Sequence, residues 1–421
     1  MPTKRKTVSQ ELLRQNKKIT DTFDKKFAFF FSVRTLVCTV LYLLVLLDFY
    51  AFVAKMKSKS SVPVFCLLVA ALYVCCFLLF VQPTYGLGGF PVKKLSRKMH
   101  RSLAGNLGSV VDYSSALLIV VSKNKGEGDF SKVQDAIDAV PVDNKNLIFI
   151  RVQPGIYREK VTIPVEKPYI ILSGRNASNT IITWNDNAGG TGGTYYCATM
   201  TVMASDFVAR FITVQNSYGP GDQAVAIRIS GDRSAFYSCR FVGFQDTVLD
   251  DSGRHYFKNC FIEGAADFIC GDGQSIYEKC HLHTVPLLNG AITAQRRLSP
   301  GEQSGFVFIH SKITGAGLMF LGRAWGPYSR VIFAYTYMDN IIFPQGWDDW
   351  NDAGRQKTVT YAQYKCSGPG SNSAGRVPWS FELSDRDAAP FLSNSFVNGE
   401  QWIRKMPTRL RRATNLTPKN G

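Results

Sequence analysis

Two carboxylates, Asp246 and Asp267, lie 21 positions apart in this 421-residue chain, and two amides, Gln223 and Gln245, lie 22 positions apart. If two carboxylates are held close together, they cannot both ionise easily, so one pKa should rise while the other stays low. Such a pair separates an acid from a nucleophile or base. These residue types can therefore act in acid–base or nucleophilic catalysis, provided that the fold brings them together.

The chain around these residues repeats at nearly the same interval. Three similar segments each contain a cysteine, namely Ala235-Phe-Tyr-Ser-Cys-Arg-Phe241, Tyr256-Phe-Lys-Asn-Cys-Phe-Ile262 and Ile276-Tyr-Glu-Lys-Cys-His-Leu282. Short β-prone repeats punctuated by Gly, Asn or Asp are typical of a β-helix. Residues one coil apart would lie about 4.8 Å from each other. We therefore expect Asp246 beside Asp267 and Gln223 beside Gln245. The alternative is that these aspartates only cap coil turns.

Five motifs occur in one order between about residues 115 and 405: Gly155-Ile-Tyr-Arg-Glu159, Gln223-Ala-Val-Ala226, Gly243-Phe-Gln-Asp-Thr247, Asp267-Phe-Ile-Cys-Gly271 and Leu321-Gly-Arg-Ala-Trp325. In these motifs the chain resembles the plant pectin methylesterases, in the form that lacks the inhibitor-like pro-region. The resemblance implies an all-β fold, a right-handed single-stranded parallel β-helix. It also implies hydrolysis of the methyl esters of homogalacturonan to pectate and methanol, with no cofactor and no metal.

The resemblance implies a role for each matching residue. Asp267 is expected to attack the ester carbonyl and form an acyl-enzyme. Asp246 is expected to protonate the leaving methoxide and then, as a base, to activate water. Gln223 and Gln245 are expected to donate to the oxyanion, and the guanidinium of Arg323 to hold Asp267 ionised and oriented.

Three further residues are expected to contact the substrate. Trp325 is similar to the family's sugar-stacking tryptophan, and we expect the same of Trp347; ordinary packing is the alternative for both. Cys270 stands where family members often have Phe lining the substrate groove. It predicts an altered subsite preference, unless it is a buried thiol or a disulfide partner.

The net charge of +17 is unevenly distributed. Residues 1–101 hold 17 Lys/Arg against 4 Asp/Glu, and the residues after Ile403 hold 6 Lys/Arg and no acid. The remainder has a net charge of −2, so the pI does not argue that the groove binds a polyanion, and we expect no nucleic-acid partner.

The N-terminal quarter of the sequence predicts membrane or signal segments. Residues 1–26 form a basic, cytosolic arm; residues 27–54 are an apolar, candidate transmembrane segment; residues 56–86 read as a signal peptide or a signal anchor beginning at Met56; and residues 87–107 are a linker. If both apolar segments spanned a membrane, the esterase would share the cytosolic side of the basic arm. We therefore expect a single signal or anchor, and the secretory pathway to the cell wall.

Residues 108–403 are the predicted catalytic domain and residues 404–421 a basic tail. Ser131 is expected to cap a short helix that plugs the open end of the β-helix. Tyr157 and Glu159 are expected to be structural. The segment from 347 to 402 should wrap back over the coils.

Ten cysteines include six in the catalytic domain, which predict either up to three disulfides or a ladder of free thiols. Asn176-Ala-Ser178 and Asn415-Leu-Thr417 are glycosylation sequons. We expect a monomer that a proteinaceous pectinesterase inhibitor can bind.

Two rival functions remain. A pectate-lyase-like enzyme needs acidic metal ligands, whereas the acids here accompany glutamines. A membrane-tethered pectin-binding protein would not need the five catalytic positions. A Ser-His-Asp hydrolase is disfavoured, because the chain has no Gly-x-Ser-x-Gly elbow.

Overall fold

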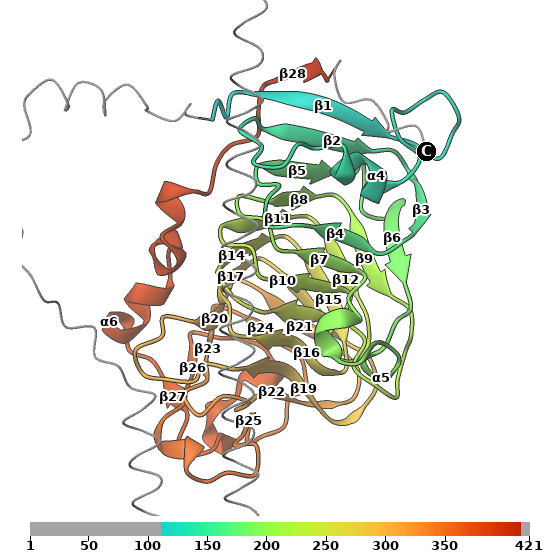
Figure 1. Ribbon diagram of the computed structural model, residues 1–421. Coiled ribbons are helices and arrows are strands. Elements are labelled where there is room, and N and C mark those ends of the chain that lie inside the picture. Colours follow the sequence, from blue (N-terminus) through green and yellow to red (C-terminus); the bar gives the residue numbers. More distant parts are fainter. Residues whose placement is uncertain (1–110, 414–421) are drawn as a thin grey trace, which may run out of the picture. The chain divides into compact units, whose positions relative to one another are not determined.

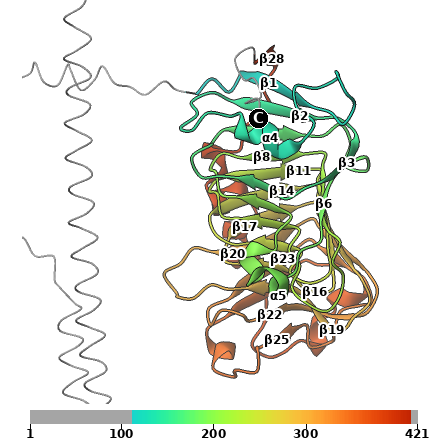
Figure 2. The same ribbon diagram turned by 45° about the vertical axis from the view of Figure 1, so that its right-hand side comes forward.

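In the computed structural model, which describes residues 111–413, short strands stack into three parallel sheets. Within each sheet, neighbouring strands are mostly three apart in the chain order. Each coil of the chain therefore gives one strand to every sheet, and the predicted parallel β-helix is confirmed (Figure 1). Figure 2 shows the coils stacked one below another from a second direction.

Within residues 111–413 the first sheet consists, in spatial order, of β27 (Phe381–Glu382), β26 (Thr360–Tyr364), β23 (Arg330–Ala334), β20 (Gly305–Ile309), β17 (Gln274–Glu278), β14 (Arg254–Lys258), β11 (Ser234–Tyr237), β8 (Val208–Arg210), β5 (Ile170–Ser173), β2 (Ile148–Val152), β1 (Ser115–Val121) and β28 (Arg409–Arg412). The second sheet consists of β25 (Trp347–Asp348), β22 (Leu318–Arg323), β19 (Leu288–Gln295), β16 (Ala266–Gly271), β13 (Val248–Asp250), β10 (Ile227–Ile229), β7 (Met200–Val202) and β4 (Val161–Ile163). The third consists of β24 (Tyr337–Met338), β21 (Lys312–Gly315), β18 (His281–Thr284), β15 (Phe261–Gly264), β12 (Arg240–Val242), β9 (Thr213–Asn216), β6 (Thr180–Trp184) and β3 (Gly155–Arg158).

Helices are short. The α-helices of the described part are α4 (Val133–Asp138), α5 (Ala188–Thr191) and α6 (Asp385–Ala388). The 3-10 turns are η1 (Thr194–Tyr196), η2 (Arg355–Lys357), η3 (Pro369–Ser371), η4 (Ser373–Gly375), η5 (Ala389–Phe391), η6 (Asn394–Val397) and η7 (Gly399–Gln401).

Helix α4 covers the N-terminal end of the coil interior, as predicted, but its cap differs from the prediction. Ser131 does not cap it: the N-cap residue is Lys132, whose side chain makes no capping bond. The carboxylate of Glu159 instead accepts from the backbone N–H groups of Val133 and Gln134, both at 3.0 Å. An acid from a neighbouring coil thus satisfies the free N–H groups and the helix dipole together. This contact gives Glu159 the structural role expected of it.

The repeated sequence segments form the interior. Phe236, Phe257, Tyr277, Phe308 and Phe333 occupy matching positions on successive coils, and their rings stack with centroids 4.4 to 4.7 Å apart. The repeat therefore reflects packing inside the coil, and not a repeated chemical site.

The cysteines of the described part are all free. Cys239, Cys260 and Cys280 are buried among apolar side chains, one on each of three successive coils. The sequence predicted either disulfides or a ladder of free thiols, and residues 111–413 contain the free thiols.

The chain after β26 returns along the outer face of the first sheet, as expected for residues 347–402 (Figure 1). Val397 and Trp402 pack there against Tyr256, Ile276 and Val307.

The chain then continues into β28, which pairs in parallel with β1. The predicted domain boundary at 403 is therefore wrong. The first residues of the supposed tail complete the sheet, because the free edge of β1 offers its unpaired backbone groups.

The predicted arm, apolar segments and linker, residues 1–107, lie outside the described residues. Between residues 111 and 413, no helix has both the length and the apolar character needed to cross a bilayer.

Candidate active site

Asp246 and Asp267 lie side by side on neighbouring coils of the second sheet. In a pair of parallel strands, an N–H that points to the neighbouring strand donates to the carbonyl of the residue just before the one it lies opposite. Leu117, for example, lies opposite Ile148 and donates to the carbonyl of Leu147. The N–H of Asp246 donates to the carbonyl of Ala266 at 3.1 Å, which sets Asp246 opposite Asp267. The predicted stacking of the two acids is therefore present.

The two glutamines are matched in the same way. The N–H of Ala224 donates to the carbonyl of Gln245 at 3.1 Å, which sets Gln223 opposite Gln245. Immediately afterwards Ala226 and Ile227 both donate to the carbonyl of Thr247. This irregularity shifts the register by one residue, so the glutamines lie 22 positions apart although β10 and β13, which follow them, pair at a spacing of 21.

Local backbone geometry aims the two acids. Both are in the left-handed region, with φ of 59° at Asp246 and 46° at Asp267. Aspartate enters this region more readily than most residues. Asp267 also lies in a bulge, because β16 has one more residue than β19 between Ala266 and Ile269. A bulge redirects side chains. Phe268 is consequently fully buried, while the Asp267 carboxylate reaches the surface of the sheet with 8% of its side chain exposed.

Arg323 holds Asp267 from two strands away. Its Nε donates to Asp267 Oδ1 at 2.9 Å, and its terminal Nη2 donates to Asp267 Oδ2, so the pair is bidentate. Arg323 ends β22, which is separated from β16 by β19. The guanidinium therefore spans an intervening strand, and this bidentate pairing fixes the plane of the carboxylate.

The environments of the two acids differ. Burial raises the pKa of Asp246 well above its usual value, the nearby Asp267 charge raises it further, and among residues 111–413 its carboxyl makes no side-chain hydrogen bond. Burial also raises the pKa of Asp267, but the hydrogen bonds and charge of Arg323 oppose the rise. The expectation that one pKa stays low is therefore wrong. Both rise, and the asymmetry comes from Arg323.

A loop that the sequence did not single out holds Gln223. Asp222 Oδ2 accepts from Asn187 Nδ2 and from the N–H of Gly189, both at 2.7 Å, and Asp222 Oδ1 accepts from the N–H of Gln223 at 2.9 Å. The carbonyl of Gln223 accepts from Ala188 N at 2.9 Å. Helix α5 and Asp222 therefore fix the backbone of Gln223, while its side-chain amide has no hydrogen-bond partner within the described part of the chain.

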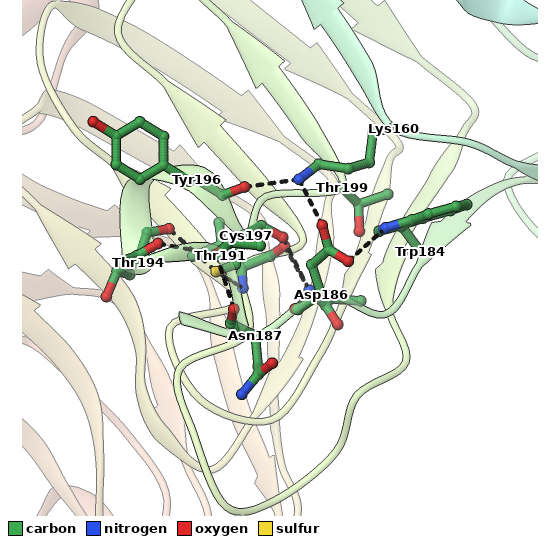
Figure 3. A network of polar contacts seen from close by, with 12 residues as sticks. Lys160, Trp184, Asp186, Asn187, Thr191, Thr194, Tyr196, Cys197 and Thr199 are labelled. Carbon is green, nitrogen blue, oxygen red and sulfur yellow. Dashed lines mark hydrogen bonds and ion pairs between the residues drawn. The ribbon is translucent and has the colours of Figure 1, made fainter. Parts of the chain in front are cut away.

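The segment from 186 to 197, which includes this loop, is tied to the preceding coil by the network in Figure 3. Lys160 Nζ donates to Asp186 Oδ2 and to the carbonyl of Tyr196, both at 2.7 Å, and Trp184 Nε1 donates to Asp186 Oδ1 at 2.8 Å. The Cys197 thiol donates to the carbonyl of Thr194 at 3.1 Å. These contacts pin both ends of the 186–197 segment.

The aromatic residues are only partly where they were predicted. Trp325 is half-buried, and the guanidinium of Arg296 lies 5.2 Å from its ring. Trp347 is 2% exposed and stacks on Tyr361 at 4.3 Å inside the coil. The prediction that Trp347 stacks on sugar is therefore wrong.

The register explains this error. Asp348 pairs with Arg323, which faces the site, so its neighbour Trp347 must face inward. The aromatic residue that the prediction missed is Trp350, whose ring lies 4.7 Å from the guanidinium of Arg323. Alternation within the Trp347-Asp-Asp-Trp350 segment was the signal that could have identified it.

Cys270 lies beneath the site and not in it. It is 3% exposed and packs with Leu249 and Ala294, under the half-buried rings of Trp325 and Trp350. Burial raises the pKa of its thiol well above the usual value, so it is an inert thiol. The prediction that Cys270 contacts the substrate is therefore wrong. Its alternative, that Cys270 is a buried thiol, is correct.

The assembled site presents an acid with a raised pKa, a carboxylate held by a guanidinium, two amides without a hydrogen-bond partner in the described part of the chain, and two half-buried indoles. Within residues 111–413, no group of three or more His, Cys, Asp or Glu side chains is placed to hold a metal ion. This set can attack a carbonyl, stabilise the oxyanion and protonate a leaving group.

The family model described as "Pectinesterase" matches residues 118–400. Putative pectinesterase 11 of Arabidopsis thaliana is 52% identical over 73% of this chain and 87% of its own length, and pectinesterase 31 of the same plant is 46% identical over 66% and 91%. The solved pectin methylesterase from carrot is 34% identical, with a TM-score of 0.66 over 68% of this chain and 94% of its own. A pectin methylesterase solved in complex with a hexasaccharide is 25% identical, with a TM-score of 0.60 over 69% and 98%.

Proposed function

The chain belongs to the pectinesterase family and hydrolyses the methyl esters of pectin, and we propose that it does so through an acyl-enzyme formed on Asp267. The observation that carries the proposal is the bidentate Arg323–Asp267 pair, which lies beside Asp246, an acid whose pKa is raised. A carboxylate that is held in one orientation and is only partly exposed is a suitable nucleophile.

In the first step an Asp267 oxygen attacks the carbonyl carbon of the ester. The carbonyl electrons move to its oxygen, where the amides of Gln223 and Gln245 donate hydrogen bonds. As the oxyanion collapses, the bond to the methoxy oxygen breaks, and the proton of Asp246 passes to that oxygen. Methanol leaves, Asp246 is ionised, and the galacturonyl group is joined to Asp267 as an anhydride.

In the second step Asp246 removes a proton from water, which attacks the galacturonyl carbonyl. The bond to Asp267 breaks and restores its carboxylate, which Arg323 again holds. Asp246 is protonated for the next cycle, and the product carboxylic acid ionises into solvent. The raised pKa of Asp246 suits both halves, because the same group must give and take a proton near the working pH.

The substrate is proposed to be methyl-esterified homogalacturonan lying over the second sheet. Trp325 and Trp350 are proposed to stack on sugar rings on either side of Arg323, because both indoles are half-buried around it.

Several finer statements are proposals too. We propose secretion to the cell wall, with a glycan attached during passage through the secretory pathway to Asn176, which is exposed. The other sequon, at Asn415, the proposed membrane attachment and the signal all fall outside the described residues. A monomeric state and an inhibitor partner stay predictions.

Methanol release from highly methylated pectin tests the function. The full chain, expressed in a plant secretory host and purified in detergent, should release methanol in the presence of a chelator and without forming an unsaturated product. Asp267→Ala should release none. An unsaturated, chelator-sensitive product would instead support the lyase. A folded wild-type chain that binds pectin but releases no methanol would support the binding protein.

A further inference from the structure

A second cleft lies on a different sheet from the catalytic acids. It opens on the outer face of the first sheet, where β2, β5 and β8 meet the chain that leads into β28. Its charged lining residues are Arg151, Arg175 and Arg210, and no acidic residue lines it. The cleft therefore carries three positive charges that nothing within it balances.

These three guanidinium groups have no hydrogen-bond or ion-pair partner in the part of the chain that the structure describes. Within residues 111–413, none of them makes a side-chain hydrogen bond or an ion pair, and the Nε of Arg210 is buried with no acceptor. Burial lowers the pKa of Arg210, as expected of a cation that lacks a nearby anion. Buried polar groups are nearly always satisfied, so the Nε of Arg210 indicates a missing acceptor.

The strand register sets the spacing of two of the arginines. Arg151 pairs with Ser173, and Ser173 pairs with Arg210, so the two cations lie two strands apart, or about 10 Å. Arg175 follows Ser173 at the corner of the same coil. A ligand that meets all three must carry several anionic groups in a row.

Apolar surfaces lie between the charges. Phe211 stacks under the guanidinium of Arg210 at 4.4 Å, and Phe149, Met406 and Leu410 also line the cleft. A small inorganic anion would use the charges but not these surfaces. A chain of sugar acids would use both, because each ring has apolar faces as well as a carboxylate.

The C-terminal segment extends the same charge. Arg409, Arg411 and Arg412 lie on β28, next to the cleft residue Leu410, and all three are exposed. Arg412 pairs with Asp129 at 3.2 Å, whereas Arg409 and Arg411 have no ion-pair partner within residues 111–413. The part of the supposed tail that folds therefore concentrates its charge at this end of the β-helix.

We propose that this cleft, named here the basic cleft and lined by Arg151, Arg175 and Arg210, binds de-esterified homogalacturonan, the polyanionic product of the enzyme's own reaction. Arginine binds carboxylates bidentately, so consecutive galacturonate units can each occupy one guanidinium. Binding there leaves the catalytic groove on the second sheet open. It tethers the enzyme to demethylated stretches and raises the effective concentration of neighbouring esters.

The test measures the affinity of the full chain, in detergent, for fluorescent polygalacturonate while a short methyl-esterified oligogalacturonate saturates the groove. The cleft variant is Arg151→Gln with Arg175→Gln, both exposed positions. The matched control is Lys312→Gln with Arg386→Gln, which removes the same charge at exposed positions away from the cleft. We expect the cleft variant to bind about tenfold more weakly, and the control to bind nearly as wild type does. Methanol release from the short oligomer should be unchanged in both.

Equal losses in the two variants would overturn the proposal, because they would show only a general charge effect. No loss in either variant would overturn it as well. Anionic phospholipid vesicles and inorganic phosphate serve as competitors. If either binds through Arg151 and Arg175 while polygalacturonate does not, the ligand is wrong. A charge reversal, Arg175→Glu alone, keeps the test valid if the double variant folds poorly.

Discussion

Two carboxylates four residues apart, Asp246 and Asp250, have opposite surroundings. Asp250 is fully buried, its Oδ1 lies 2.5 Å from His255 Nδ1, and its Oδ2 accepts from the hydroxyl of Tyr277 at 2.6 Å. The other imidazole nitrogen of His255 faces the carbonyl of Gly231 at 3.1 Å. Asp246 is only half-buried and has no comparable side-chain partner within residues 111–413.

The difference shows how one fold gives one residue type two uses. Every oxygen of Asp250 is occupied, so it joins three coils together and is unavailable to a substrate. The raised pKa of Asp246 favours the protonated form, and its oxygens stay open to the substrate, at the cost of an unsatisfied, partly buried carboxyl. We therefore expect changes at Asp250 to affect stability, and changes at Asp246 and Asp267 to affect turnover.

The largest effect should follow removal of the nucleophile. Asp267→Ala should lower kcat roughly 10⁴-fold or more, as in other covalent catalysts, while the far-UV circular dichroism stays that of wild type. Methanol release by equal amounts of folded protein measures it. Asp251→Ala is a control that removes a nearby half-buried acid outside the proposed set. If it lowers kcat equally, Asp267 loses its special role.

Asp246→Asn should lower kcat by about 10²- to 10⁴-fold, because it removes the acid and base. By contrast, the same substitution should increase the stability of the fold relative to wild type as pH rises. The folded state holds the Asp246 proton more tightly than the unfolded state, so this group stabilises the fold most below the ordinary aspartate pKa, about 4. As pH rises from there, that contribution is lost.

Asparagine does not titrate. The free energy of unfolding of Asp246→Asn should therefore gain on wild type as pH rises above about 4. Urea unfolding at a series of pH values measures the gap between the two proteins. A gap that is constant with pH would contradict the raised pKa.

Asp250→Ala should lower the free energy of unfolding by about 3–5 kcal/mol, because it leaves His255 and Tyr277 buried without their acceptor. Tyr277→Phe should cost about 1 kcal/mol, because it removes one hydrogen bond and keeps the stacked ring. The kcat per folded molecule should change little in both, which thermal unfolding combined with methanol release can show. If Asp250→Ala were as stable as wild type, the contrast between a structural Asp250 and a catalytic Asp246 would be contradicted.

The smallest effects should distinguish Trp325, which is expected to bind substrate, from Trp347, which lies in the core. Trp325→Ala should raise KM for pectin by about fivefold, since one aromatic contact is worth about 1 kcal/mol, and should leave stability nearly unchanged. Trp347→Phe should lower the free energy of unfolding by about 1–2 kcal/mol and leave KM unchanged, because its ring is in the core. If Trp347→Phe instead raised KM and left stability unchanged, Trp347 would be a substrate-binding residue after all.

The sequence predicted what depends on periodicity. The 21-residue repeat gave the coil length, and with it the neighbours of Asp246 and of Gln223. It could not predict what depends on the register between paired strands or on distant contacts. The inward turn of Trp347 follows from the register of β25 against β22, which no motif shows. The Glu159 cap of α4 and the pairing of β28 with β1 join segments that are far apart in the chain.

The same limit applies to electrostatics. Spacing predicted that two acids would stack, but their pKa values depend on burial, and burial raised both. The basic cleft was hidden for a related reason. Its arginines come from separate coils, and the chain average of the catalytic domain is slightly negative.

The central claim is the covalent intermediate on Asp267, and rapid-quench kinetics tests it most directly. Wild-type protein mixed with excess methylated oligogalacturonate should release a burst of methanol equal to the enzyme concentration if deacylation is the slower step. Wild-type protein quenched during the burst should carry a galacturonyl adduct that mass spectrometry places on the peptide containing Asp267. Turnover without any adduct on that peptide, even under hydroxylamine trapping, would show that water attacks the ester directly, and would contradict the account.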